Sequence, residues 1–452
     1  MSAPAEEPCW SGSSSLWLPF FLLQLVAFAS SVCGAADAQV HVFYYMWYGS
    51  PEHDGGWKHW NHRVLPHWQQ EVTDLYRHVG TNHTPPADIH APFYPLLGPY
   101  SSRDANLLSQ HMDWLVGIGA DALVLSWHGI HGGADGEGVR THRNLNHFVR
   151  ALERKIEEWA ARKRVPVGDF DPPLKVIFHM EPYRGRNITS VQYDMQFIVR
   201  TFNDTRWLYR DPITRLPWFY LYDSYHIKPA LWQQVLCPEA DGPGCVRGSD
   251  IDGVFMGLCL DGSSLIDAAR AGFDGCYSYF ASDGFTPAST TSRWPWFQQE
   301  ACSQGRGMGT KRPFQFIPCV GPGYDDTKIR PWNKATTRQR KNGAYFAQMW
   351  DAAQLLQEEP PLDCKGQLPV AGLTSFNEWG EGSQIEPAVE REGYHTYPSD
   401  ERPGRKGDPY FFLKASREYI DRWKGPGGEA ARREWREEWD DGKGVRPPDQ
   451  EL

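Results

Sequence analysis

Eight short apolar runs recur along the chain, and most of the intervals between them contain a helix-like pattern. The runs are residues 40–47, 122–127, 174–180, 218–223, 252–258, 275–280, 314–320 and 371–376. Apolar positions recur at helical spacing in the intervals, for example in 144–163 and 342–357. Continuous apolar strands that alternate with helices are typical of a parallel sheet covered by helices. Eight such units predict a single (β/α)8 TIM barrel; a doubly wound sheet is the alternative, but no G-x-G-x-x-G follows the first run.

The segments outside this pattern set the domain boundaries. We expect one catalytic domain over residues 39–424, with loop insertions at 134–146 and 236–250. The tail 425–452 is rich in charge, and we expect it to form a loosely docked helix followed by disorder. No internal sequence repeat is present.

The N-terminus carries one apolar run, at residues 16–29, interrupted by Pro19 and Gln24. It is short for a membrane span and typical of the hydrophobic region of a signal peptide. The small residues Cys33-Gly34-Ala35 follow it as a cleavage site. Residues 1–35 are therefore predicted to be a cleaved signal peptide, with a signal anchor as the alternative. Either one directs the rest of the chain to the lumen of the secretory pathway.

Glycosylation sequons and cysteines agree with that compartment. The sequons begin at Asn82, Asn187 and Asn203. Two of the nine cysteines lie in the leader, and Cys237 and Cys245 are close enough in a polar loop to form a local disulfide. Three others lie in apolar runs and are expected to be buried thiols: Cys259, Cys276 and Cys319.

Charge and composition narrow the class of ligand. A formal net charge of −10 argues against a nucleic-acid groove or a polybasic membrane surface. Aromatic residues reach 14%, with 20 Trp and 20 Tyr. Many of these rings will pack in the core, but such an excess also suits the flat C–H faces of sugars.

Polar residues gather where the predicted strands end, which is where a barrel builds its active site. The densest case is SFNEWGEGSQIE at 375–386, where Glu378 and Glu381 flank Trp379. Glutamates at this spacing are usually on the solvated face of a helix, but Gly380 and Gly382 break helices. Glycoside hydrolysis needs two carboxyl groups, and a tight turn can hold an i,i+3 pair at the roughly 5–5.5 Å used by retaining enzymes. Trp379 is either a wall of the sugar pocket or a wedge in the barrel rim, and Glu386 is expected to be a surface or structural residue.

A second dense stretch, residues 44–68, carries four histidines among aromatic residues. The spacing His59-x-x-His62 suggests a metal-dependent hydrolase, but no H-E-x-x-H is present and the residues lie among Gly and Pro. Sugar sites use His as a hydrogen-bonding group without a metal. We therefore expect no metal and no cofactor.

Several blocks together resemble glycoside hydrolase family 99, the endo-α-1,2-mannosidases. They occur in order from about residue 39 to 420: FYYMWYG, HWNH, FYPLLGPYSSRD, LSWHG, FHMEPY, YDSY, GFDGCYSYFASDGF, VGPGYDDTKIRPWN and SFNEWGEGSQIE. The resemblance implies a (β/α)8 barrel that cleaves an internal α-1,2-mannosidic bond with retention of configuration. Vertebrate members act on glucosylated high-mannose N-glycans in the Golgi and release a glucosyl-mannose unit, whereas bacterial relatives cut α-mannan.

The resemblance also implies roles for particular residues. The glutamate matching Glu378 would deprotonate the 2-hydroxyl of the sugar, which forms a 1,2-anhydro sugar, and the glutamate matching Glu381 would protonate the leaving oxygen and then activate water. From the strand ends and these blocks together, the candidate substrate-binding residues are Tyr45, His59, Trp60, His62, Trp127, His128, His179, Glu181, Tyr222, Asp223, Tyr279, Tyr324, Asn377 and Trp379.

One position departs from the family. After Trp127 the family presents another aromatic residue toward the −2 sugar, and this chain has His128. The preference for glucose or mannose at the −2 position is therefore open. An enzyme secreted to degrade α-mannan is an alternative, and so is a mannose-binding protein without activity. The expected partner is a high-mannose N-glycan or a mannan oligosaccharide, bound by a monomer.

Overall fold

A parallel sheet of nine strands forms the centre of the protein. The computed structural model describes residues 38–130, 133–237, 244–305, 313–364, 367–398 and 407–440. The strand order is β8-β7-β6-β5-β4-β3-β1-β10-β9, and every neighbouring pair is parallel. The strands are β1 (Gln39–Tyr44), β3 (Ala122–Trp127), β4 (Lys175–Met180), β5 (Trp218–Leu221), β6 (Val254–Leu258), β7 (Gly275–Tyr277), β8 (Gln315–Ile317), β9 (Cys319–Val320) and β10 (Val370–Leu373).

The two ends of this sheet come from one apolar run. β8 pairs with β7 and β9 pairs with β10, and only Pro318 separates β8 from β9. Proline has no N–H to donate and interrupts a ladder at this point. The run 314–320 therefore closes the sheet into a barrel. It contributes both β8 and β9, and each of the other seven predicted runs contributes one strand. The prediction of a (β/α)8 TIM barrel is confirmed.

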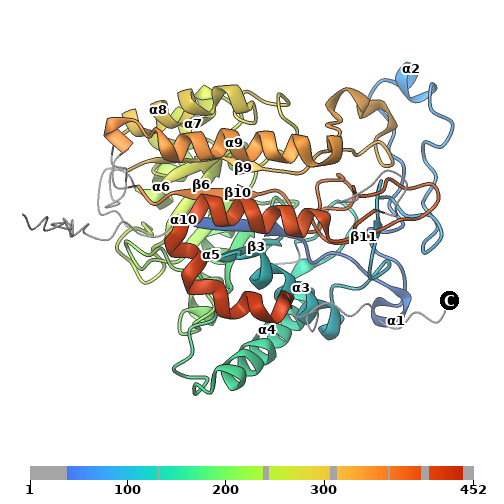
Figure 1. Cartoon of the computed structure of the whole chain (residues 1–452). Coiled ribbons are helices and arrows are strands. Elements are labelled where there is room, and N and C mark those ends of the chain that lie inside the picture. Colours follow the sequence, from blue (N-terminus) through green and yellow to red (C-terminus); the bar gives the residue numbers. More distant parts are fainter. Residues whose placement is uncertain are drawn as a thin grey trace, which may run out of the picture. The chain divides into compact units, whose positions relative to one another are not determined.

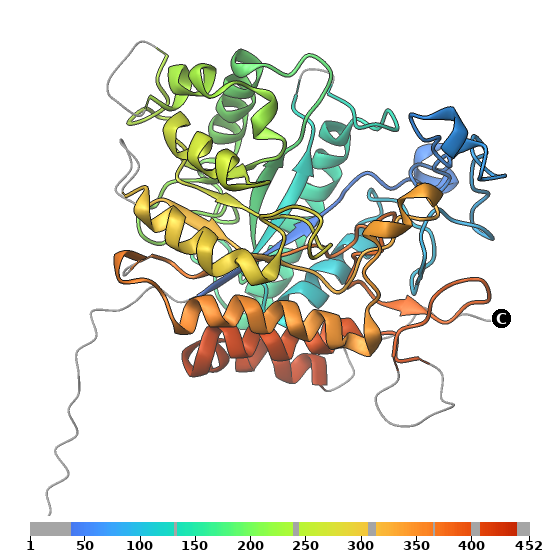
Figure 2. The same cartoon turned by 90° about the horizontal axis from the view of Figure 1, so that it is seen from above.

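Helices cover the outside of the barrel (Figure 1, Figure 2). The long ones are α3 (Ala105–Ile118), α4 (Thr141–Lys163), α5 (Ile188–Phe202), α6 (Pro229–Leu236), α7 (Gly262–Ala271), α8 (Trp294–Ser303), α9 (Ala344–Glu358) and α10 (Phe411–Asp440). Shorter elements lie in the loops: α1 (Pro51–Asp54), α2 (Gln70–Thr73), the antiparallel pair β2 (Tyr94–Pro95) and β11 (Ala388–Val389), and the 3-10 turns η1 (Ser224–His226), η2 (Thr291–Arg293), η3 (Pro331–Thr336), η4 (Lys341–Gly343) and η5 (Leu362–Cys364).

Two predicted segment boundaries change. The insertion predicted at 134–146 ends at residue 140, because α4 begins at Thr141. The segment 236–250 begins inside α6, whose last residue is Leu236. The charged tail is helical as far as Asp440, beyond a kink at Gly425 where two helical segments of α10 meet. Residues 1–35 and 441–452 lie outside the described part, so the signal-peptide and disorder predictions stay predictions. Among the described helices, none combines the length and hydropathy needed to cross a bilayer.

The barrel interior is filled by aromatic rings and histidines. Phe43 contacts His179, Tyr220 and Tyr277 at centroid distances of 5.0, 5.6 and 5.8 Å. The polar tips find partners inside this core: the His179 ring nitrogen lies 2.7 Å from the Tyr277 hydroxyl, and that of His41 lies 2.9 Å from the Tyr220 hydroxyl. Because these side chains pack against one another, the barrel is a solid support for the residues at its rim.

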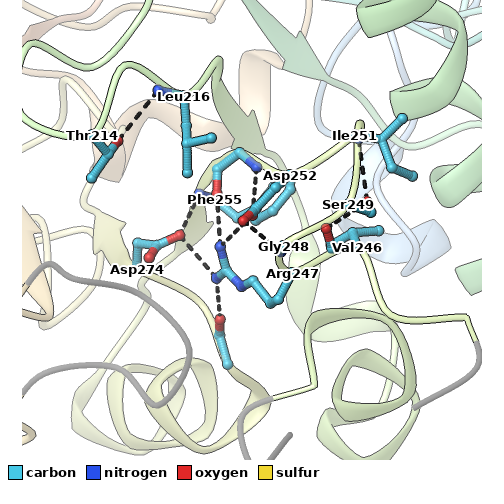
Figure 3. Close-up of polar contacts among 12 residues, drawn as sticks. Thr214, Leu216, Val246, Arg247, Gly248, Ser249, Ile251, Asp252, Phe255 and Asp274 are labelled. Atoms are coloured by element: carbon cyan, nitrogen blue, oxygen red, sulfur yellow. Dashed lines mark hydrogen bonds and ion pairs between the residues drawn. The ribbon is translucent and has the colours of Figure 1, made fainter. Parts of the chain in front are cut away.

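At the N-terminal ends of β6 and β7, a buried arginine ties the loops together (Figure 3). The Arg247 guanidinium donates to the Asp274 carboxylate at 2.9 Å and to the carbonyls of Gly253 and Gly272 at 2.7 and 2.6 Å. Asp274 also accepts the Phe255 backbone N–H at 2.8 Å. The charge is thus paired and hydrogen-bonded, which is the condition for burying it.

The cysteines are partly as predicted. The Cys237–Cys245 disulfide is confirmed, and Cys319 is a free, buried thiol as expected. The prediction of free thiols is wrong for Cys259 and Cys276, which form a disulfide with a Cα–Cα distance of 5.5 Å. Cys259 directly follows β6 and Cys276 lies within β7, and the register of these two neighbouring strands brings the cysteines close together. A third disulfide joins Cys302 to Cys364.

The three sequon asparagines, Asn82, Asn187 and Asn203, all lie at exposed positions. Asn187 also caps the N-terminus of α5, accepting from the backbone N–H of Thr189 and Ser190. Glycosylation at these sites stays a prediction.

Candidate active site

The segment that follows β10 folds into a closed turn. The Ser375 N–H donates to the Ser383 carbonyl at 2.9 Å, and the Ser375 hydroxyl accepts the Glu378 N–H at 2.8 Å. Gly382 has a φ of 59°, and a Cβ there would meet Pro92 at 2.8 Å and the Asp325 carbonyl at 3.0 Å. Only glycine fits at that point. The turn holds Glu378 and Glu381 at the C-terminal end of the barrel.

Asn377 fixes this turn to the loop after β1. Its side-chain oxygen accepts the Tyr45 N–H at 2.8 Å, and its side-chain nitrogen donates to the Tyr45 carbonyl at 2.8 Å. The Tyr48 hydroxyl donates to the Asn377 carbonyl at 2.8 Å. Asn377 is fully buried, so it acts here as a positioning residue rather than as an open hydrogen-bonding group.

Both candidate catalytic glutamates have a raised pKa. Burial raises the pKa of Glu378 well above its usual range, and repulsion from Glu381 adds to the effect. Burial likewise raises the pKa of Glu381, to about 7, although Arg330 opposes the shift. Two interacting carboxyls titrate as a pair, and near neutral pH such a pair retains a proton. The site therefore holds both a carboxylic acid and a carboxylate.

Four residues of the segment after β9 lie around Glu381. Arg330 forms an ion pair with the buried Asp326 at 3.0 Å and lowers the pKa of Glu381. Tyr324 donates to Asp326 at 3.2 Å and also hydrogen-bonds Glu381. The Asp325 N–H donates to the Glu381 carbonyl at 2.7 Å, which holds the two segments together. Tyr324 is thus placed as predicted, whereas Arg330 and Asp326 are additional site residues.

Glu181, which follows β4, is a third carboxylate of the site, and its pKa is shifted in the other direction. Burial alone raises the pKa of Glu181, but the His179 ring nitrogen, 2.8 Å from its carboxylate, more than offsets this, and the pKa is lowered. Glu181 is therefore ionised at neutral pH. His179 and Glu181 lie together at the end of β4, as the sequence predicted.

Three tyrosines face these carboxylates. The hydroxyls of Tyr45 and Tyr279 form a hydrogen bond, and the Tyr222 ring meets the Tyr279 ring edge-on at 4.9 Å. Burial raises the pKa of each of the three, and Glu381 adds to the shift in each, so all three remain protonated donors. These tyrosines were predicted and are brought together.

Two histidines of the second dense stretch are paired with carboxylates from the loop before α4. His59 lies 2.8 Å from Asp135, and His62 lies 3.2 Å from Glu137. His59 also stacks on Trp47 at 4.4 Å, and Trp47 stacks in turn on Tyr45 at 4.4 Å. Within the described ranges, no three His, Cys, Asp or Glu side chains are grouped as metal ligands.

His128 is buried near Glu181 and Asp135. Its backbone N–H donates to the Thr141 hydroxyl at 2.9 Å, and its ring nitrogen lies 3.3 Å from that hydroxyl. Burial lowers the pKa of His128, although Glu181 and Asp135 oppose the shift, so the ring is neutral at pH 7. A neutral imidazole can both donate to and accept from a sugar hydroxyl.

Asp223 lies at the end of β5 with a φ of 49°. Its side chain is 19% exposed, and its backbone carbonyl accepts from Arg186 at 2.7 Å. Arg186 also donates to the Tyr222 carbonyl at 2.7 Å, so one half-buried guanidinium shapes the loop that carries both residues. Asp223 is therefore held at the rim, as predicted.

Three predicted sugar-binding tryptophans are buried instead. Trp60 and Trp379 are fully buried, and Trp379 donates to Glu386 at 2.8 Å. Trp127 faces outward from β3 and stacks on Phe197 of α5 at 5.9 Å. Trp379 is therefore a wedge in the rim, and none of the three rings is open to a sugar in this structure. A ring at the end of a strand can point to either side, and sequence spacing did not decide which.

Glu386 is a structural residue and not a surface residue. It is fully buried, and its carboxylate lies 2.7 Å from the Tyr100 hydroxyl and 3.1 Å from a His111 ring nitrogen. Together with the contact to Trp379, these partners anchor the end of the turn. The sequence analysis missed Trp47, Asp135, Asp326 and Arg330. Trp47 lies two residues from the predicted Tyr45, whereas the other three reach the site from segments distant in sequence from the residues they act on. Their only signal was their place in or beside the matching blocks.

Comparisons with known proteins identify the family of the chain. The sequence profile of glycosyl hydrolase family 99 matches residues 35–425. A glycoprotein endo-alpha-1,2-mannosidase of Rattus norvegicus is 37% identical over 85% of this chain and 74% of its own length. A glycoprotein endo-alpha-1,2-mannosidase-like protein of Homo sapiens is 35% identical over 85% and 75%. The solved GH99 endo-alpha-mannosidase of Bacteroides thetaiotaomicron superposes with a TM-score of 0.65 at 33% identity, over 85% of this chain and 97% of that one. The chain thus belongs to glycosyl hydrolase family 99, and it is a glycoside hydrolase.

Proposed function

We propose that this protein is a retaining endo-α-1,2-mannosidase that acts on glucosylated high-mannose N-glycans and releases a glucosyl-mannose unit. The observation that carries the proposal is the pair Glu378 and Glu381 at the C-terminal end of the barrel: Glu378 is buried, Glu381 is half-buried, and both have raised pKa values. The relatives named above are endo-α-mannosidases, which supports the substrate class.

In the proposed reaction, Glu378 takes the proton of the 2-hydroxyl of the bound mannose. The 2-oxygen attacks the anomeric carbon, the glycosidic bond breaks, and the leaving oxygen takes the proton of Glu381. Water, deprotonated by Glu381, then attacks the anomeric carbon of the 1,2-anhydro sugar, and the 2-oxygen recovers its proton from Glu378. Both carboxyls have a raised pKa and titrate as a pair, and the first step uses the form in which Glu381 carries the proton and Glu378 is ionised.

We also propose that the protein works in the lumen of the secretory pathway, with the Golgi as its site. Three disulfides join described cysteines. Disulfides persist in oxidising compartments such as this lumen. The exposed sequons and the endo-mannosidase names of the relatives are consistent with the same compartment.

The test is product sizing by mass spectrometry. Wild type and Glu381→Gln would be incubated with the glucosylated high-mannose glycan, with its non-glucosylated counterpart and with α-mannan. Release of a glucosyl-mannose disaccharide by wild type alone supports the proposal, and proton NMR of the fresh product should show the α-anomer. A matched control is Glu52→Gln, which changes an exposed carboxylate in α1. Faster cleavage of α-mannan would contradict the N-glycan substrate.

A further inference from the structure

A group of aromatic rings stands at the edge of the site and has no role in the proposed reaction. Trp68 is 78% exposed, more than any other tryptophan whose exposure the structure describes. Its ring meets His67 at 3.6 Å and Trp332 at 5.3 Å, and His67 meets Trp332 at 4.9 Å. We call His67, Trp68 and Trp332 the aromatic platform.

The platform is held in place by backbone contacts and not by burial. The Trp332 indole N–H donates to the Leu65 carbonyl at 3.2 Å. The His67 N–H donates to the Thr73 hydroxyl at 3.0 Å, and that hydroxyl donates back to the His67 carbonyl at 3.1 Å. Isolated exposed aromatic residues are ordinary. Three rings fixed at defined angles by two separate segments, with one ring open to solvent, form a ready-made surface for a flat apolar face.

One segment connects the platform to the catalytic acid. Arg330, which acts on Glu381, precedes Trp332 by two residues, a separation of at most about 7 Å along the chain. The Leu65 N–H donates to the Ile329 carbonyl at 2.8 Å, so the Trp68 side of the platform is tied to the same segment. Because Glu381 protonates the leaving oxygen in the proposed reaction, this segment lies on the side of the departing glycan.

We propose that the aromatic platform binds an α-mannosyl residue of the departing part of the glycan, at a distance from the cleaved bond. The inference rests on the proposed function. A branched high-mannose glycan carries further mannoses on that side, and the C–H face of one of them can lie on Trp68. The platform is then a specificity determinant that favours branched glycans over short linear ones, through binding and not through chemistry.

The experiment compares two substrates that share the cleaved bond. One is the branched glucosylated high-mannose glycan, and the other is the linear trisaccharide Glc-Man-Man, whose departing part is a single mannose. Trp68→Ala should lower kcat/KM on the branched glycan about tenfold, mainly through KM, because it removes binding that is equal in the ground and transition states. The trisaccharide should be cleaved at the wild-type rate.

Two further variants sharpen the test. Trp68→Phe keeps a ring and should recover most of the lost kcat/KM. Trp296→Ala removes another exposed tryptophan, 50% exposed on α8, and should change neither substrate. An equal loss on both substrates, or no loss on either, would overturn the platform's role.

A binding measurement separates this inference from the proposed function. The branched departing glycan alone would be titrated by calorimetry into Glu381→Gln and into the double variant with Trp68→Ala. Weaker binding by the double variant supports the platform even if wild type cleaves neither substrate, a result that would overturn the proposed function alone. Equal binding by both variants would overturn the platform.

Discussion

The two ends of the barrel both bury carboxylates, but they give them opposite partners. At the N-terminal end, Asp274 receives the Arg247 guanidinium and a backbone N–H. At the C-terminal end, Glu378 faces Glu381, and the pKa of each is raised. Glu181 also lies at the C-terminal end, but it resembles Asp274 in having a basic partner: the His179 ring, 2.8 Å away, keeps the pKa of Glu181 low.

The difference in partners means that the carboxylates at one end stabilise the fold and those at the other end serve the reaction. A buried ion pair with further hydrogen bonds to the backbone fixes the loops it joins, and losing one partner leaves a buried charge unpaired. Two like charges buried together cost stability when both are ionised, but they keep a proton available near neutral pH. Substitutions at the two ends should therefore fail in different ways, one in the reaction rate and the other in the free energy of unfolding.

The largest expected effect is on the reaction rate. Glu381→Gln should lower kcat/KM on the glucosylated high-mannose glycan by about a thousandfold, because general acid–base catalysis of this kind contributes about 10²–10⁴. Urea unfolding at pH 7.5 should show that the free energy of unfolding is unchanged or higher, since a carboxylate in an unfavourable environment has been neutralised. A variant that is both inactive and less stable would contradict the separation.

The next effect is on stability. Arg247→Met should lower the free energy of unfolding by about 3–5 kcal/mol, because Asp274 keeps a buried charge without its partner. Activity of the folded variant, assayed well below its unfolding temperature, should stay within about threefold of wild type, since the substitution lies at the end of the barrel remote from catalysis. Arg200→Met is the matched control: its ion pair is exposed and 4.0 Å long, so the loss should be below about 1 kcal/mol. Loss of activity without loss of stability in Arg247→Met would contradict the assignment of this end of the barrel to stability alone.

The sequence predicted the barrel because buried parallel strands are continuous apolar runs. It also predicted which strand ends carry polar groups, so Glu181, Tyr222, Tyr279 and Glu378 were found. It did not predict which way a side chain points, so Trp127 was placed in the site although it packs against α5. The face of the sheet to which a side chain at a strand end points depends on register and packing, and a local sequence pattern does not contain that information.

Contacts between distant segments were the second limit. Cys259 and Cys276 looked like separate buried thiols, and only the pairing of β6 with β7 shows them to be neighbours. In the same way, the pKa of Glu381 depends on Arg330, which lies 51 positions earlier in the chain. Spacing within one segment could suggest the carboxylate pair, but the charges that tune the pair come from other loops of the barrel.

A smaller effect should appear in the pH dependence of stability. The pKa of Glu381 is raised from 4.5 to about 7 on folding, so its contribution to stability is complete below about pH 4.5 and is lost as the pH rises toward 7. The free energy of unfolding of wild type, relative to Glu381→Gln, should therefore fall across this range, by at most about 1.4 kcal/mol per pH unit. Urea titrations of both proteins at half-unit steps measure the difference. A difference that is flat, or that rises with pH, would mean that the carboxylate is not held in an unfavourable environment.

The finest test changes the charge beside the pair and leaves the pair in place. Arg330→Met removes the cation that lowers the pKa of Glu381 and leaves Asp326, which raises it, without its ion-pair partner. Because the acid must be protonated, kcat/KM of wild type should decline above about pH 7, and in the variant this decline should move upward by about one pH unit. Arg330→Lys keeps the positive charge and should move the decline less. A decline that stays in place or moves to lower pH in Arg330→Met would show that another group limits the rate at alkaline pH.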